Sequence, residues 1–128
     1  MRIEHVALAS RSEEESQKFF SRLLGFEKVR EFVVSEDLME QFFNIKKEHK
    51  VIRYKNEQIE LEVFITNDNS NAKDLFTHIC LFVKDKSELL ENALEMEYKV
   101  IKVARKEVND FYLFLKDDFG NLYEIKSQ

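Results

Sequence analysis

The stretch Glu4-His5-Val6-Ala7-Leu8 has a counterpart in Thr77-His78-Ile79-Cys80-Leu81, in the second half of the chain. Each is a largely apolar run that contains one histidine and has the alternation of a strand. A strand carrying a glutamate closes each half, at residues 58–65 and at residues 122–125. A helical stretch and further strands lie between the opening and closing strands of both halves. A repeat of this kind predicts two copies of one structural unit.

Local signals predict the other elements. Ser12 followed by three glutamates is typical of a helix N-cap, and Gly25 of the residue that follows a helix end. The expected strands cover residues 2–9, 26–34, 51–55, 58–65, 75–83, 99–105, 109–116 and 121–126, with helices over residues 13–24, after Ser35, and over 86–97. The predicted fold class is α+β, with two paired βαβββ modules. They form a curved, mixed eight-stranded sheet, a cup, with the helices outside.

The run Thr66-Asn67-Asp68-Asn69-Ser70-Asn71 has a linker-like composition and divides the sequence almost in half. At 128 residues, the chain has the size of one domain. We therefore expect a single domain over residues 1–128. Module 1 is expected at 1–66, a linker at 67–74 and module 2 at 75–128.

Composition narrows the function classes. The net charge of −5 argues against non-specific nucleic-acid binding, which needs a basic surface. No apolar run approaches the roughly 20 residues needed to span a bilayer, and no basic segment followed by an apolar run indicates a signal peptide. The single cysteine, Cys80, cannot form an internal disulfide, which fits a reducing cytosol. We expect a cytoplasmic protein with no nucleic-acid or membrane partner.

Two histidines and two glutamates at matched positions favour a metal site. His5 and His78 lie on apolar strands, where an unpaired imidazole is costly to bury. Glu124 lies on the last strand, and the closing strand of the first half has Glu60 and Glu62 on one face. Each residue alone is by default a solvated side chain or a satisfied core histidine. The imidazole and carboxylate donors together suit Zn²⁺, Ni²⁺, Co²⁺, Mn²⁺ or Fe²⁺.

The remaining polar and aromatic candidates have less distinct roles. Cys80 shares the face of His78 and is expected to line the cup rather than to bind metal. His49 falls in a charged connection and is expected at the surface. The helix after Ser35 is expected to pack on the core as a lid, with substrate recognition as the alternative. Candidate substrate-binding residues on the strands are Arg53, Phe64 and Tyr112.

The chain resembles the vicinal oxygen chelate superfamily, which includes glyoxalase I, methylmalonyl-CoA epimerase, fosfomycin-resistance enzymes, extradiol dioxygenases and bleomycin-resistance proteins. The resemblance is carried by residues 3–7, 19–26, 59–61, 77–79 and 117–125 and spans essentially the whole chain. It implies the metal ligands of glyoxalase I-like and epimerase-like members, here His5, Glu60, His78 and Glu124. Glu60 is preferred to Glu62 because Ile59-Glu60-Leu61 best matches Tyr123-Glu124-Ile125.

The resemblance also implies a function. We expect a metal-dependent, glyoxalase-like lyase or isomerase whose small substrate chelates the metal through two adjacent oxygens. Glu124 would move the proton, with Glu60 as the partner carboxylate, while the metal stabilises the enediolate. The alternative is a non-catalytic drug- or metabolite-binding protein of the bleomycin-resistance type, and a third reading is a regulatory module. Small members of the superfamily commonly pair, so a homodimer is expected.

Overall fold

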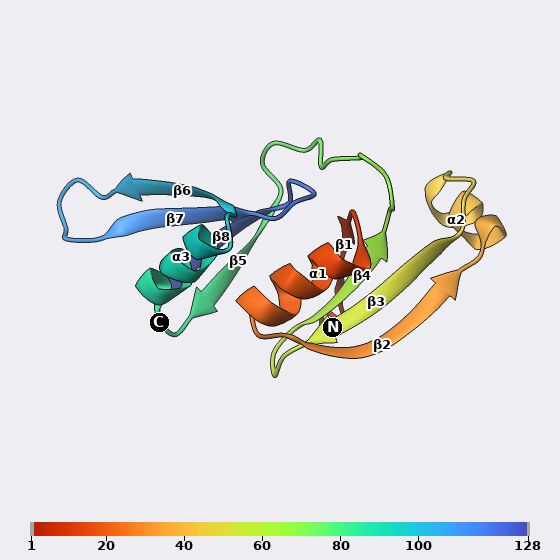
Figure 1. The fold of residues 1–128 in the computed structure, drawn as a ribbon, viewed down its shortest axis with the longest axis horizontal. Helices are drawn as coiled ribbons and strands as arrows, with labels where there is room; N and C mark the ends of the chain where they lie inside the picture. Colours follow the sequence, from red (N-terminus) through yellow and green to blue (C-terminus); the bar gives the residue numbers. More distant parts are fainter. Residues whose placement is uncertain (1, 128) are drawn as a thin grey trace. The chain divides into compact units, whose positions relative to one another are not determined.

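The computed structural model describes residues 2–127 (Figure 1). Met1 and Gln128, the ends of the predicted domain, lie outside the described residues. The chain divides into two compact units, Met1–Ser70 and Asn71–Gln128. The first contains β1 (Val6–Ser10), α1 (Glu13–Ser16), η1 (Gln17–Leu23), β2 (Glu27–Val34), α2 (Glu36–Phe43), β3 (His49–Lys55) and β4 (Glu60–Ile65). The second contains β5 (His78–Val83), α3 (Lys86–Glu95), β6 (Lys99–Ala104), β7 (Phe111–Lys116) and β8 (Leu122–Ser127).

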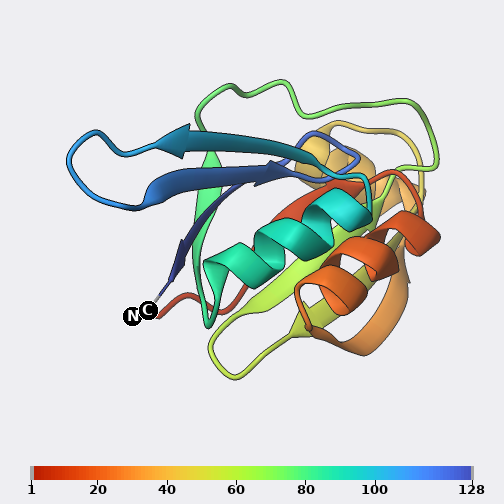
Figure 2. The same cartoon turned by 60° about the vertical axis from the view of Figure 1, so that its left-hand side comes forward.

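Each unit builds one four-stranded mixed sheet. The strand orders are β1-β4-β3-β2 and β5-β8-β7-β6, so the two units have the same topology. The opening strand runs parallel to the closing strand in each unit, and the other neighbours are antiparallel. Figure 2 shows α3 along one face of the second sheet, and α1 with η1 along one face of the first. The predicted α+β class with eight strands in a repeated order is confirmed.

The first unit is built around a helix that changes pitch. Ser12 caps it, because its side chain accepts a hydrogen bond from the Glu15 amide at 3.1 Å. The helix starts as α1 and continues as the π-helix η1, which buries Phe19 and Phe20. Gly25 ends it with a φ of 77°, a left-handed conformation that costs glycine little. The N-cap and the terminating glycine are as predicted; the π-helical pitch was not expected.

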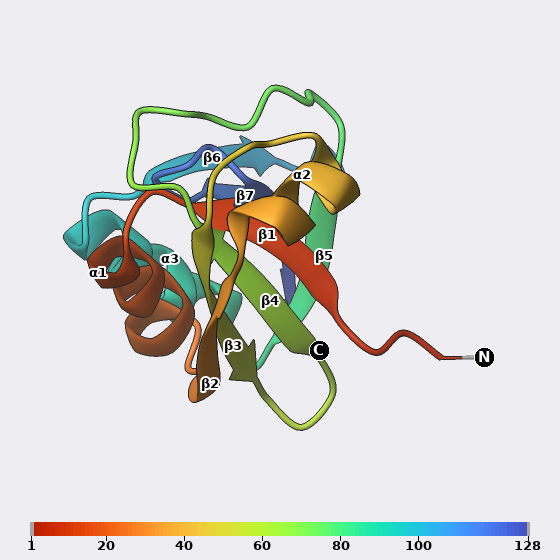
Figure 3. The ribbon, with the colours of Figure 1, turned by 90° about the vertical axis from the view of Figure 1, so that its right-hand side faces the viewer.

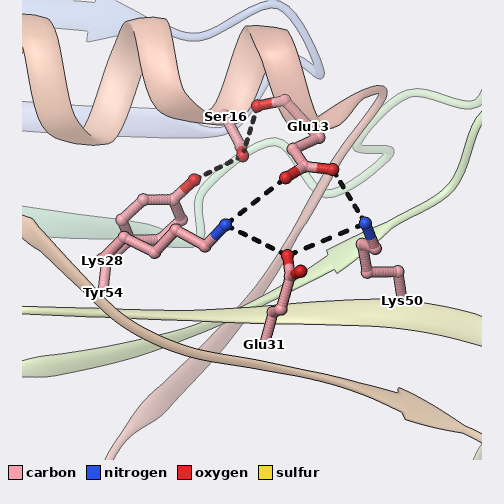
Figure 4. Close-up of polar contacts among 6 residues, drawn as sticks. All are labelled: Glu13, Ser16, Lys28, Glu31, Lys50 and Tyr54. Carbon is pink, nitrogen blue, oxygen red and sulfur yellow. Dashed lines mark hydrogen bonds and ion pairs between the residues drawn. The ribbon is translucent and has the colours of Figure 1, made fainter.

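A cluster of polar side chains ties this helix to β2 and β3 (Figure 4). The Ser16 hydroxyl donates to the Glu13 carbonyl at 3.0 Å, so the Tyr54 hydroxyl is the donor in their 2.7 Å contact. Ser16 and Tyr54 are both fully buried. The neighbouring ion pairs are partly exposed and join Lys28 and Lys50 to Glu13 and Glu31. Because exposed pairs contribute about 1 kcal/mol or less, the buried hydroxyl pair is the stronger tie.

In the first unit, one prediction is wrong and the first strand starts later than predicted. His49 was predicted at the surface, but it begins β3, is 8% exposed and contacts the Lys47 carbonyl through Nδ1 at 2.9 Å. The reason is that β2 extends far enough for Val34 to pair with His49. The first strand begins only at Val6, so His5 immediately precedes it.

The helix expected after Ser35 is α2, seen near the end of β2 in Figure 3. Ser35 caps it by accepting a hydrogen bond from the Leu38 amide at 3.3 Å. The helix buries Met39 and places the Phe43 ring edge-to-face on Phe64, with 5.4 Å between centroids. Within residues 2–127, none of the helices has the length and apolarity that a membrane span requires.

The second unit packs α3 on its sheet through apolar side chains. Asp85 caps the helix by accepting from the Glu88 amide at 3.1 Å. The buried residues of this core are Leu89, Leu90, Ala93, Leu113, Leu115, Tyr123 and Ile125. The buried Asp117 organises the turn between β7 and β8.

The Asp117 carboxylate accepts hydrogen bonds from the backbone amides of Phe119, Gly120 and Asn121, each at 3.0 Å. It also accepts from the Tyr123 hydroxyl at 2.9 Å. Burial raises the pKa of Asp117, while these hydrogen bonds oppose the rise. The turn therefore holds the start of β8 in a fixed register, and with it Glu124, which follows Tyr123 on that strand.

Candidate functional site

The second unit brings together His78, at the start of β5, and Glu124 on the neighbouring β8. His78 Nδ1 lies 2.8 Å from the Phe76 carbonyl oxygen. A carbonyl oxygen only accepts hydrogen bonds, so Nδ1 is the donor in this contact. Nε2 faces Glu124 Oε2 at 3.3 Å. A proton or a metal cation between Nε2 and the carboxylate would satisfy both atoms. A histidine ligand whose other ring nitrogen donates to a carbonyl is also typical of metal sites.

Two neighbours frame this pair. The Phe114 ring meets the His78 ring nearly edge-on, with centroids 5.6 Å apart, and Phe114 is the cross-strand partner of Glu124. Cys80 pairs with Glu124 on the other side. Burial and the Glu124 charge raise the pKa of the Cys80 thiol. Because the thiolate is the ligand form of cysteine, this environment disfavours Cys80 as a metal ligand.

The first unit repeats the arrangement with His5. Its Nδ1 is hydrogen-bonded to the Glu4 carboxylate, and its Nε2 lies 3.7 Å from Glu62 Oε1. The hydrogen bond from His5 is the main reason that the pKa of Glu4 is lowered. As in the second unit, one ring nitrogen has a local partner and Nε2 faces a carboxylate from the closing strand. Glu4 was not singled out by the sequence analysis, although its place beside His5 was a signal for this contact.

Strand register identifies which glutamate of β4 corresponds to Glu124. Cys80, two residues after His78, pairs with Glu124. Ala7, two residues after His5, pairs with Glu62. The structural counterpart of Glu124 is therefore Glu62, whereas the sequence match had aligned Glu60 with it. Both glutamates have apolar neighbours on both sides, so local sequence similarity does not distinguish them.

Arg53, on β3, binds the carboxylates of the first unit. Its guanidinium contacts Glu62 Oε2 through Nε at 2.9 Å and through Nη2 at 2.8 Å. Nη1 lies 3.3 Å from both Glu60 and Glu4. Burial lowers the pKa of Arg53, but hydrogen bonds to Glu4 and Glu62 outweigh it and raise the pKa overall. Arg53, predicted to bind substrate, here holds one oxygen of Glu62 and leaves the other facing His5.

The four predicted ligands divide between the two units. The structure brings His78 and Glu124 together, whereas His5 faces Glu62 and Glu60 contacts Arg53. Within neither unit do three or more His, Cys, Asp or Glu side chains of residues 2–127 form a group able to hold a metal ion. Each unit by itself thus provides one imidazole and one facing carboxylate. Of the predicted substrate contacts, Phe64 packs on α2 and Tyr112 lines a cavity of the second unit that Glu124 also lines.

Comparison with known proteins gives the family context. The sequence model of the Glyoxalase/Bleomycin resistance protein/Dioxygenase superfamily matches residues 4–114. The structure is similar to that of a glyoxalase family protein from Enterococcus faecalis, with 20% identity, coverage of 97% of this chain and 95% of that one, and a TM-score of 0.70. No curated protein matches the sequence.

The fold is also similar to that of the fosfomycin resistance protein FosX from Listeria monocytogenes, with 11% identity, coverage of 100% of this chain and 93% of that one, and a TM-score of 0.74. A mutant of FosX complexed with Mn(II) and 1S,2S-dihydroxypropylphosphonic acid is 11% identical, with coverage of 97% and 87% and a TM-score of 0.70. At these identities the likeness shows the fold alone.

Proposed function

Because this chain belongs to the Glyoxalase/Bleomycin resistance protein/Dioxygenase superfamily, we propose that it is a metal-dependent lyase or isomerase. Its substrate is a small molecule that binds through two adjacent oxygens. The observation that carries the proposal is the repeated His–Glu pair, in which Nε2 faces a carboxylate at 3.3 Å in one unit and at 3.7 Å in the other. The Mn(II) complex of FosX, a protein of the same fold, supports a divalent metal.

The proposed ligands are His5, Glu62, His78 and Glu124, with Glu60 as the alternative carboxylate. Both histidines satisfy the metal-site pattern, because Nδ1 has a local partner and Nε2 is left to a cation. Two imidazoles and two carboxylates suit the divalent metals from Mn²⁺ to Zn²⁺. A metal ion held there would supply Lewis acidity and make the C–H bond beside the chelating oxygens easier to deprotonate.

Glu124 is the better candidate for moving the substrate proton. Arg53 fixes Glu62 through two short contacts, at 2.8 and 2.9 Å, so this carboxylate is restrained. Glu124 has looser contacts, 3.3 Å to His78 and 3.9 Å to Lys126. A carboxylate with long contacts reorients at lower cost, which suits a group that must accept and return a proton.

The second candidate is a non-catalytic small-molecule binding protein, and Arg53 is the observation that favours it. One guanidinium already contacts the carboxylates of Glu4, Glu60 and Glu62. Part of the negative charge of the first unit is therefore compensated without a metal ion. In a binding protein of this kind, the side chains of the His–Glu pairs would line the surface that contacts the small molecule.

Calorimetric titration of the chelator-treated protein with Mn²⁺, Ni²⁺ and Zn²⁺ distinguishes the two candidates. The enzyme proposal expects one ion bound per chain, weakened by Glu124→Gln, and metal-dependent turnover of a dicarbonyl hemithioacetal or a related chelating substrate. If wild type binds none of the three ions, the binding-protein function replaces it.

We also propose that the protein is a cytoplasmic homodimer. Light scattering at tens of micromolar tests the dimer, because assembly depends on protomer concentration.

A further inference from the structure

Two neighbouring strands of the second unit diverge at one end. β7 and β8 are paired from Leu113–Ile125 to Lys116–Leu122. Both strands continue beyond Leu113 and Ile125, but there β7 pairs with β6 and β8 pairs with β5. Figure 2 shows the two blue strands separating toward the start of β7 and the end of β8. A cavity of about 470 Å³ is lined by residues of these diverging segments and by the start of α3.

The lining of this cavity is rich in cations. Lys86, Arg105 and Lys126 contribute positive charges, against the two carboxylates of Asp110 and Glu124. Asp110 is already bound by two of these cations, Lys86 at 2.8 Å and Arg105 at 3.3 Å. The hydrogen bond from Lys86 is the main reason that the pKa of Asp110 is lowered to about 2. Asp110 is therefore an anion at neutral pH, and three cations against two carboxylates leave the lining with a net charge of +1, in a chain whose overall net charge is negative.

The cations keep hydrogen-bond donors for a ligand. Lys86 has three N–H groups, and its contacts with Asp110 and with the Phe111 carbonyl, at 2.6 Å, use two of them. Arg105 has five N–H groups and one contact with Asp110. Lys126 lies 3.9 Å from Glu124, which is beyond hydrogen-bond distance. The Lys86 side chain is only 11% exposed, so its charge is less screened by water than a surface charge.

We propose that this cavity binds the anionic group of a small molecule, a carboxylate or a phosphate, through Lys86, Arg105 and Lys126. Its volume is in the range of small-molecule sites. Glu124 lines the same cavity, so a bound anion would hold the rest of the molecule beside the carboxylate assigned to proton transfer. This last step rests on the proposed function and makes the substrate an anionic one; the anion site itself does not depend on it.

The test is titration of the metal-free protein with inorganic phosphate and with acetate, at constant ionic strength set with chloride. Amide chemical shifts in two-dimensional NMR report both the affinity and the place of binding. We expect saturable shifts at residues 109–113 and 124–127. Arg105→Gln and Lys126→Gln each remove a charged donor from a partly exposed side chain and should weaken binding by about tenfold. Lys99→Gln is the matched control, because Lys99 is exposed on β6 and does not line the cavity.

Each outcome decides the proposal. Weaker binding by Arg105→Gln and Lys126→Gln, with Lys99→Gln unchanged, establishes the anion site, and a preference for phosphate or acetate identifies the ligand group. No saturable binding of either ion, or equal weakening by all three substitutions, overturns it. Phosphate binding without any binding of divalent metal would support the anion site and refute the metal-dependent function. Metal binding without binding of either anion would refute the anion site and leave the metal-dependent function standing.

Discussion

Glu60 and Glu62 offer a matched pair of substitutions that separates the structural assignment from the sequence match. Changing either to Gln keeps the size of the side chain and removes its charge. Arg53 makes two contacts with Glu62, at 2.8 and 2.9 Å, and one with Glu60, at 3.3 Å. The Arg53 side chain is 14% exposed, so the lost charge is only partly replaced by water.

A hydrogen bond to a charged partner stabilises by about 1 kcal/mol more than one to a neutral partner. Glu62→Gln weakens two such contacts and should lower the free energy of unfolding by about 2 kcal/mol. Glu60→Gln weakens one contact of a side chain that is 30% exposed, and its cost should stay below about 1 kcal/mol. Urea unfolding in the presence of a chelator measures both values without any contribution from metal.

Metal binding by the same two variants tests the ligand assignment. Replacing an outer partner of a metal ligand typically lowers affinity by about 10–100-fold, so loss of a ligating carboxylate should cost at least about 100-fold in Glu62→Gln. Glu60→Gln should bind nearly as tightly as wild type. A greater loss of metal affinity in Glu60→Gln would restore the sequence-based assignment. Metal affinity equal to that of wild type in both variants would refute a carboxylate ligand from the first unit.

Arg53→Gln is the complementary variant. Without the guanidinium, the carboxylates of the first unit repel one another, so stability should fall in the presence of a chelator. Metal affinity should rise, because a competing positive charge has been removed from beside Glu62. A fall in metal affinity, measured by the same calorimetry, would instead mean that Arg53 is needed to orient Glu62.

Three further predictions concern stability. Leu61→Ala, at a position 2% exposed on the opposite face from Glu62, should cost about 2–5 kcal/mol in urea unfolding without changing the stoichiometry of metal binding. Ser16→Ala leaves the Tyr54 hydroxyl unpaired and should cost about 1–3 kcal/mol, whereas a change within error would show that water replaces the bond. The folded-state pKa of Asp110, about 2, is below its ordinary value of 3.8, so its contribution to stability should be complete above pH 4 and lost as the pH falls through about 2. Unfolding between pH 2 and 6 should show this loss in wild type and not in Asp110→Asn.

The features that the sequence predicted well are those set by neighbouring residues. The Ser12 cap and the glycine after the first helix are each specified within four or five positions of the chain. The repeated order of strands followed from alternation and from the position of the linker. These signals were enough for the fold class and for the order of helices and strands along each unit.

Features that depend on distant contacts were not predictable in the same way. The π-helical pitch of η1 has no distinct pattern, because the apolar spacing of Phe19 and Phe20 fits an α-helix equally well. His49 lies in a run of charged residues, and only its pairing with Val34 across β2 and β3 makes it part of a strand. Tertiary pairing, rather than local propensity, placed His49 in a strand.

The candidate site shows the same division. Histidine and glutamate at matched points of a repeat pointed to His5, His78 and Glu124. The choice between Glu60 and Glu62 depends on the offset between β1 and β4, strands far apart in the sequence, and this offset has no local signature. The cations around the cavity of the second unit come from α3, the β6–β7 connection and β8, so no short motif unites them.

The parallel pairing of the first and last strands of each unit has a consequence for folding. Almost the whole unit lies between β1 and β4, and between β5 and β8, so these pairings close the longest loops and are expected to form late. The antiparallel neighbours, β3 with β4 and β7 with β8, close much shorter ones. In each unit, the histidine lies at the start of the opening strand and the glutamate on the closing strand, so the His–Glu pair joins the two strands that are expected to pair late. Occupation of these pairs by a cation would therefore slow unfolding more than it speeds folding, because a contact absent from the transition state acts on the unfolding rate.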